Sequence, residues 1–231
     1  MPNYLRRRDL NNPNEGINDN QIFLLSLISY AIIIFKYNKN NNYKIINEFL
    51  HLIHTILIIS LLTYNINNIA IITSLAFYII DTIKLICIDK IKKYQFILHH
   101  IIAIYSLYNT YFDVENIKNN ALEIFYILEY SNIMLYINNI IYNLTKNKYI
   151  ITFISIKQFL WYSICRIIFF GICIYNNFDT ILQKQIYIKI TIFSIYLIGF
   201  IWSIFLAKRT WNYIKLNYKI HHIYNINYKL E

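Results

Sequence analysis

The sequence predicts an all-α protein, a polytopic bundle of about seven helices that cross a membrane. Of its 231 residues, 57% are hydrophobic and only 15% are charged. A soluble domain of this length would show amphipathic alternation and far more charge. Here the apolar residues form long runs and the charges collect between them, as in polytopic membrane proteins. Because the runs do not alternate polar and apolar residues, a transmembrane β-barrel is excluded.

Each apolar run is close to the roughly 20 residues that a helix needs to span a bilayer. A polar segment, residues 1–20, precedes the membrane domain 21–207, and a basic tail, residues 208–231, follows it. The polar segment shows no secretory signal peptide, so the first run is expected to be retained as a spanning or anchor helix. No proline interrupts the runs, so no kink is expected. The predicted helices cover residues 21–36, 45–64, 68–89, 94–112, 121–144, 149–176 and 186–207.

The second, third and fourth predicted helices carry ionisable side chains, which are costly in hydrocarbon and therefore mark candidate sites. At a rise of about 1.5 Å per residue, His54, Asp81 and the adjacent histidines His99 and His100 lie at similar depths. A cluster of histidine and aspartate that opens toward the cytosol is therefore predicted. The polar or small residues at helical spacing are Glu48, His51 and His54, then Ser74, Tyr78 and Asp81, and then His99, Ala103, Ser106 and Thr110.

The fifth and sixth predicted helices contain further polar stripes, which must face a cavity or one another because lipid cannot satisfy them. Glu129 and Arg166 lie deeper than the histidines and at similar depth, which predicts that they pair, so that both stay charged. The stripes consist of Glu129, Asn132, Tyr136 and Asn139 with Ser131 beside them, and of Gln158, Tyr162 and Arg166. The predicted lipid-binding residues are His54, Asp81, His99, Glu129, Ser131 and Arg166.

Simpler explanations exist for some of these polar residues. Asp81 precedes Lys84 by three residues. Alternatively, therefore, Asp81 only neutralises the charge of Lys84, whose side chain extends to the membrane interface. His51 is alternatively a residue near the headgroups without a function. His99 is expected to meet Asp81 and His54, because a neutral imidazole can hydrogen-bond a carboxylate and a lipid headgroup together. His100 is expected to pack, since neighbours on a helix point about 100° apart.

Composition and motifs exclude several other classes of function. The net charge of +10 is spread over loops, where it matches an anionic lipid surface, and nucleic acid is not expected as a partner. The membrane segments hold four histidines, which are too few for a di-iron site, so no metal and no cofactor are expected. The chain also lacks the GxSxG motif of serine hydrolases. Membrane lipids are the expected partners.

Six stretches of the chain, in this order and spacing, resemble the TLC-domain family, which contains the ceramide synthases and several lipid-linked relatives. The resemblance covers about Asn47–Leu216. Its most specific features are the aspartate of the third helix, the histidine pair, and a Glu-x-Ser one helix later. The stretches are HLIHTILIISLLTY, FYIIDTIKL, ILHHIIAIYSLY, LEYSNIMLYINNIIYN, LWYSICRIIFFG and LIGFIWSIFLAKRTWNYIKL.

The resemblance implies a TLC-like helical bundle, and its details are similar to the small non-synthase TLC domain-containing proteins. Ceramide synthases carry HDxxD in the helix after the histidine pair, whereas this chain has Glu129-Tyr130-Ser131 there and no homeodomain-like segment before the core. The implied function is lipid handling in the endoplasmic reticulum or a related internal membrane: sensing, transport or regulation of sphingolipids or phospholipids.

Two other functions stay open on the sequence. One is an acyl-CoA-dependent N-acyltransferase of the ceramide synthase type, which acts on sphingoid bases. In that mechanism acyl-CoA is a co-substrate, and His99 or His100 is the general base, oriented by Asp81. The other is a structural membrane protein whose polar stripes only hold helices together.

The distribution of lysine and arginine predicts the orientation in the membrane, because cytosolic loops are enriched in both. With seven spans, the basic loops and the basic tail all lie on one face, and Asp113, Glu115 and Asp179 lie on the other. The arginines at 6–8 oppose this orientation but are outweighed. The basic residues on the expected cytosolic face are Lys36, Lys39, Lys44, Lys90, Lys92, Lys93, Lys146, Lys148, Lys208, Arg209, Lys215, Lys219 and Lys229.

We therefore expect the C-terminus in the cytosol and the N-terminus in the lumen. In sealed microsomes, added protease should digest a tag at the C-terminus and spare a tag at the N-terminus. Permeabilised microsomes, in which both tags are cut, serve as the control. A C-terminal tag that stays protected contradicts this orientation.

Overall fold

The computed structural model describes residues 18–37, 43–87, 94–112, 115–183 and 186–227, and this part of the chain is helical with no strand. The all-α prediction is thereby confirmed, and each predicted run corresponds to a helix or to a continuous helical stretch. The elements are α1 (Asp19–Tyr37), α2 (Tyr43–Thr63), α3 (Asn67–Cys87), α4 (Tyr94–Phe112), α5 (Glu115–Leu144), α6 (Lys148–Ser163), η1 (Ile164–Phe169), α7 (Phe170–Asn176), α8 (Phe178–Leu182) and α9 (Ile186–Asn227).

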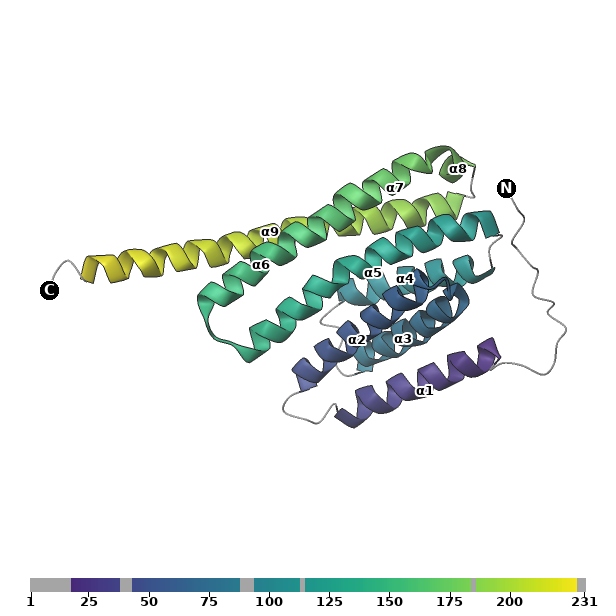
Figure 1. Ribbon diagram of the computed structural model, residues 1–231, viewed down its shortest axis with the longest axis horizontal. Coiled ribbons are helices and arrows are strands. Elements are labelled where there is room, and N and C mark those ends of the chain that lie inside the picture. The colour runs from purple at the N-terminus through teal and green to yellow at the C-terminus, as the bar shows by residue number, and fades with distance from the viewer. Residues whose placement is uncertain (1–17, 38–42, 88–93, 113–114, 184–185, 228–231) are drawn as a thin grey trace.

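Five helical stretches of the described chain are long and apolar enough to span a bilayer, and they make this an integral membrane protein. The helices α4 and α5 carry more polar residues and run through the same bundle (Figure 1). Together they account for the expected number of about seven helices. The apolar stretches are Asp19–Lys36, Tyr43–Thr63, Asn67–Cys87, Lys148–Asn176 and Ile188–Tyr218.

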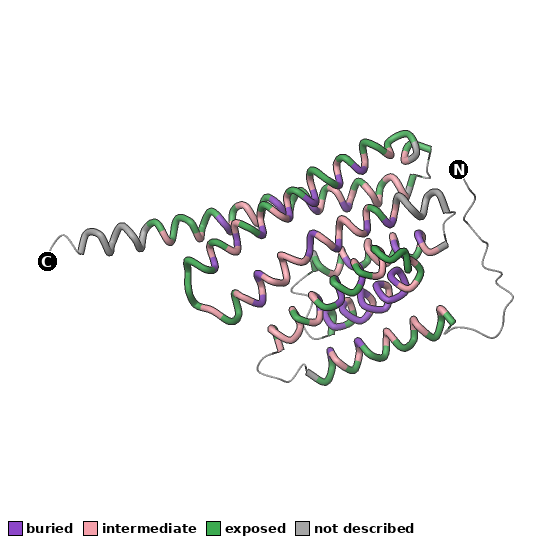
Figure 2. Tube along the Cα trace, in the orientation of Figure 1, coloured by how far each residue is buried: buried purple, intermediate pink, exposed green. Residues whose placement is uncertain are grey.

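The helix α3 lies at the centre of the first half of the bundle. It packs against α1, α2 and α4, while α2 also packs along α5, and Figure 2 shows the buried residues concentrated on α3. Its small residues Ala70, Ser74 and Ala76 have no exposed surface, and Phe77 is 1% exposed. Small side chains let neighbouring helices approach closely, which is how helices associate in lipid.

The outer faces of the helices are apolar as well. Leu24 and Leu25 on α1 and Ile53 on α2 are more than half exposed, and α9 presents Ile204 and Phe205 in the same way. Water would penalise an apolar surface of this extent, whereas the hydrocarbon of a bilayer accepts it. The burial pattern therefore fits a bundle whose polar groups face inward.

The second half of the bundle is built on the pair α6 and α9, which pack against each other. Asn147 caps α6, since its side chain accepts hydrogen bonds from the backbone N–H groups of Tyr149 and Ile150. The helix α9 continues beyond the predicted membrane run, and Asn217 donates to Thr152 of α6 at 2.7 Å. The α5–α6 turn and the C-terminal part of α9 thus lie at the same end of the bundle (Figure 1).

The helix predicted over 149–176 is present as a continuous helical stretch, but it is not α-helical throughout. Residues Ile164–Phe169 form a π-helical segment between α6 and α7. Such a segment inserts an extra residue into a helical turn without any proline, and it often occurs at functional positions. Arg166, one of the predicted site residues, lies within it.

Candidate functional site

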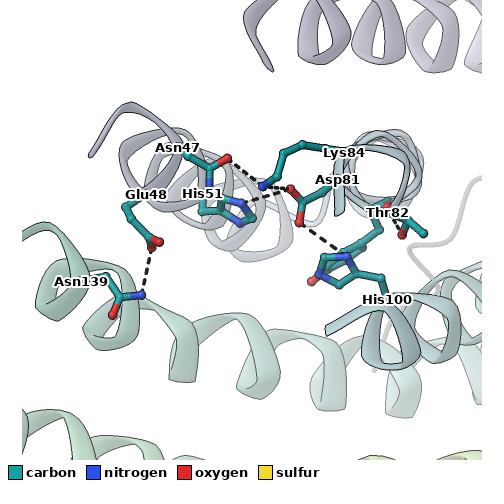
Figure 3. A network of polar contacts seen from close by, with 9 residues as sticks. Asn47, Glu48, His51, Asp81, Thr82, Lys84, His100 and Asn139 are labelled. Atoms are coloured by element: carbon teal, nitrogen blue, oxygen red, sulfur yellow. Dashed lines mark hydrogen bonds and ion pairs between the residues drawn. The ribbon is translucent and has the colours of Figure 1, made fainter. Parts of the chain in front are cut away.

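The carboxylate of Asp81 is the centre of a buried ionic cluster (Figure 3). Asp81 is 2% exposed and Lys84 is 3% exposed, and the lysine Nζ lies 2.7 Å from Asp81 Oδ1. Nε2 of His51 lies 3.4 Å from the same oxygen, and Nδ1 of His100 lies 3.5 Å from Oδ2. Lys84 Nζ also donates to Oδ1 of Asn47 at 3.0 Å. The cluster therefore joins α2, α3 and α4 through one carboxylate.

Of the histidines predicted to gather near Asp81, His100 is in the cluster, whereas His51 takes the place expected for His54. His54 was expected beside Asp81, but its Nδ1 lies 2.9 Å from the hydroxyl of Tyr30 on α1, and its ring stacks on Phe77 at 3.9 Å. Three residues along an α-helix amount to a rotation of about 300°, so His51 and His54 point about 60° apart. That difference sends His51 toward Asp81 and His54 toward α1. The contact between Asp81 and Lys84 is present, and Lys84 is buried within the bundle rather than extended to the interface.

The two histidines of α4 also have the reverse of their predicted orientations. His100 is 6% exposed and faces Asp81, whereas His99 was expected there. The ring of His99 lies 5.5 Å from that of Trp202 on α9 and lines a cavity. The two neighbours are rotated by about 100° on the helix. The orientation of α4 against α3 decides which of them meets the carboxylate.

Glu129 of α5 forms a second buried polar group, separate from the ionic cluster. It is 1% exposed, and its oxygens accept hydrogen bonds from the hydroxyls of Tyr78 at 2.5 Å and Thr55 at 3.0 Å. Hydrogen bonds to a buried acidic group are worth more than in water because the surroundings are of low dielectric. Hydroxyls from α2 and α3 therefore hold α5 in place.

Arg166 does not form the predicted pair with Glu129. Its Nε donates to the Ser131 hydroxyl at 2.6 Å, and its Nη2 donates to Asn132 Oδ1 at 3.1 Å and to the Leu128 carbonyl at 3.2 Å. Among the described residues no ion pair links it to Glu129. The guanidinium therefore donates hydrogen bonds to neutral acceptors on one face of α5. The oxygens of the Glu129 carboxylate accept hydrogen bonds from Tyr78 and Thr55 instead. Ser131, a predicted lipid-binding residue, is thus a partner of Arg166.

The helix α9 passes close to Arg166 at Gly199. A Cβ atom at Gly199 would lie 3.3 Å from the Cβ of Arg166, which is tighter than ordinary van der Waals contact. Glycine at this place lets α9 pass directly over the π-helical segment. The sequence offered a signal for this contact, because Gly199 lies in the middle of a long apolar helix. The π-helical segment itself had no such signal.

A cavity of about 50 Å³ lies between α4, α5, η1 and α9. Three of the predicted site residues, His99, Glu129 and Arg166, line it, whereas His54, Asp81 and Ser131 are not among its lining residues. Its polar wall adjoins an apolar one, which extends toward the end of α4 at Thr110 rather than toward the expected cytosolic face. The apolar or small residues of the lining are Ala103, Leu107, Ala121, Ile124, Phe125, Leu128 and Ile195.

A family model for the TLC domain matches residues 21–216. This range contains the ionic cluster around Asp81, the residues of the cavity and the π-helical segment. Searches of curated proteins and of solved structures found no match.

Replacing Lys84 by Met is expected to destabilise the protein strongly, because it leaves the buried carboxylate of Asp81 without its nearest cation. Removing one member of a buried ion pair costs about 3–5 kcal/mol. Lys157→Met is the matched control, since Lys157 is exposed on α6 and lies over the ring of Phe153, a contact worth about 0.5–1 kcal/mol. Thermal unfolding in detergent measures both variants. Equal losses would contradict the role of Lys84.

Gly199→Ala should also lower the melting temperature. Overpacking costs about 1–3 kcal/mol, which exceeds the gain of up to about 1 kcal/mol from the better helix propensity of alanine. Gly171→Ala in α7 is the control, because its Cβ would meet the Tyr196 hydroxyl at an ordinary 3.5 Å. If Gly199→Ala is as stable as Gly171→Ala, α9 does not approach Arg166 as closely as described.

Proposed function

Because the chain belongs to the TLC-domain family, we propose that it binds a membrane lipid between its helices and acts in lipid handling. The proposed roles are sensing, transport or regulation of sphingolipids or phospholipids in an internal membrane such as the endoplasmic reticulum. The cavity between α4, α5, η1 and α9 is the proposed place of binding, and the lipid's polar group is proposed to contact His99.

The position of His99 carries this proposal. Its ring contacts Trp202 and His100, and no hydrogen bond joins it to any of the described residues. It shares the cavity with Glu129 and Arg166, whose own hydrogen bonds are directed to other helices. His99 is partly buried, and an imidazole in an apolar bundle gains from a polar partner, because a polar group kept from water without a partner is costly. A ligand with a hydroxyl or an amine supplies that partner.

The size and lining of the cavity favour one small polar group on an apolar chain. A space of about 50 Å³ is smaller than a complete site for a drug-sized ligand. It has room for a hydroxyl or an amine, while the chain of the lipid is directed along Ala103, Leu107 and Phe125 between α4 and α5. An amphiphile therefore fits this lining better than a soluble polar metabolite.

The acyltransferase alternative receives less support from the geometry. A general base in that mechanism must reach the substrate and must also be oriented by Asp81. In this structure His100 faces Asp81 and is 6% exposed, while His99 lines the cavity. The two requirements are thus met by different residues. A purely structural role for the polar stripes gives no reason for the position of His99.

His99→Ala is expected to weaken the effect of the protein on cellular lipid composition while the protein still inserts and accumulates. Loss of a single hydrogen bond, worth about 0.5–1.5 kcal/mol, should reduce the lipid retained by the purified protein about two- to tenfold. Quantitative lipid mass spectrometry of expressing cells and of the purified protein measures both effects. His99→Gln, which keeps a hydrogen-bonding side chain, should retain more lipid than His99→Ala.

His100→Ala serves as the comparison for this experiment. Because it removes an imidazole from the buried cluster around Asp81, it is expected to lower accumulation and thermal stability. If His99→Ala accumulates normally and the cells have the same lipid profile as with the wild type, the cavity is not the lipid site and the proposal is refuted.

A further inference from the structure

A second pocket, of about 450 Å³, lies between α4, α5, α6 and α9. It shares no lining residue with the cavity at His99, and it lies toward the end of the bundle where α5 ends and α6 begins. Its volume falls within the range of about 300–1,000 Å³ that is typical of ligand sites. The lining side chains used below are Phe96, Tyr162, Trp202, Phe205 and Arg209.

One end of this pocket is cationic. The guanidinium of Arg209 lies near two aromatic rings, 5.6 Å from the ring of Tyr142 and 5.7 Å from the ring of Tyr213. Its Nε lies 3.4 Å from the Tyr213 hydroxyl. No acidic side chain of the described chain pairs with it, and Lys146 and Lys148 line the adjoining pocket behind the two tyrosines. A guanidinium held in this way is suited to bind a phosphate through two parallel hydrogen bonds.

The other end is aromatic and open to the outer surface of the bundle. The rings of Phe96 and Trp202 are 5.2 Å apart, and Phe96 and Phe205 are 39% and 53% exposed. Both belong to the apolar outer surface that faces the hydrocarbon in a membrane. Phe205 and Arg209 are four residues apart on α9, so the apolar wall and the cation follow each other along about 6 Å of helix. This is the order of chain and headgroup in a phospholipid.

The pocket also contains an unsatisfied polar group. The hydroxyl of Tyr162 is buried and has no hydrogen-bond partner among the described residues, although the residue is only 1% exposed. A buried hydroxyl of this kind normally has a partner. The carbonyl of an acyl ester is an acceptor that a phospholipid carries between its phosphate and its chains.

We propose that this pocket is a binding site for a phospholipid of the bilayer, with its phosphate on Arg209 and an acyl chain against Trp202 and Phe205. The lipid reaches the site sideways from the membrane, past Phe96 and Phe205. The site is distinct from the cavity at His99, so the protein has two places for lipid that differ in the chemistry they recognise. The second one recognises an anionic phosphate.

The test uses the full-length protein in maltoside micelles, which contain no phosphate. A photoreactive, alkyne-tagged phosphatidic acid is compared with a diacylglycerol that carries the same reactive chains. Phosphatidic acid should label peptides of α9 on the order of tenfold more strongly than the diacylglycerol. Equal labelling by the two analogues would overturn the assignment, and this comparison requires no variant.

Two variants on adjacent residues assign the phosphate contact. Arg209→Gln should reduce labelling by phosphatidic acid to the diacylglycerol level, and Arg209→Lys should restore part of it. Lys208→Gln removes the same charge from an exposed neighbour outside the pocket and should leave labelling unchanged. If Arg209→Gln labels like the wild type, or if millimolar inorganic phosphate abolishes labelling, the site does not select a phospholipid and the proposal is wrong.

Discussion

The carboxylate of Asp81 is buried in a part of the bundle where neither water nor lipid can balance its charge, so the protein must supply its partners. They come from three helices: His51 from α2, Lys84 from α3 itself and His100 from α4. Each partner requires its helix to take a particular rotation and height. The packing of the small-residue face of α3 and the direction in which His99 points both depend on this arrangement.

The protein treats its two buried acidic groups differently, and the difference shapes the cavity. Asp81 is surrounded by cationic or ionisable nitrogens, whereas Glu129 is held by the hydroxyls of Tyr78 and Thr55. Arg166 is in turn satisfied by Ser131, Asn132 and a carbonyl, all of α5. Because these partners are neutral, the side chains of Glu129 and Arg166 stay at the wall of the cavity instead of closing it with an ion pair.

The cavity at His99 and the pocket at Arg209 adjoin a layer of aromatic side chains. Trp202 contacts His99 at 5.5 Å on one side and Tyr162 at 6.5 Å on the other, and Arg166 lies 5.3 Å from the ring of Tyr162. These residues come from four different elements, α4, α6, η1 and α9. His99 and Arg166 line the cavity, whereas Trp202 and Tyr162 line the pocket, so these contacts connect the walls of the two spaces.

The sequence by itself determined the class of fold, the helices and the family. The run predicted at 94–112 coincides with α4, and most other helix ends differ from the predicted ones by a few residues. The helices could be predicted because the length of an apolar run and the backbone hydrogen bonds of a helix are local properties. The family could be inferred because it depends on the order of short motifs along the chain, and the match over residues 21–216 confirms it.

Only the tertiary structure decided which polar groups meet. Whether His51 or His54, and His100 or His99, meets Asp81 depends on rotations of about 60–100° about a helix axis. The prediction compared depths along the helices, and depth does not reveal these rotations. The predicted pair of Glu129 and Arg166 failed for a related reason. Depth placed them at one level, but the π-helical segment at Ile164–Phe169 and the close passage of Gly199 set the direction of the guanidinium. These features arise from packing between helices, which a periodic pattern in one chain segment does not encode.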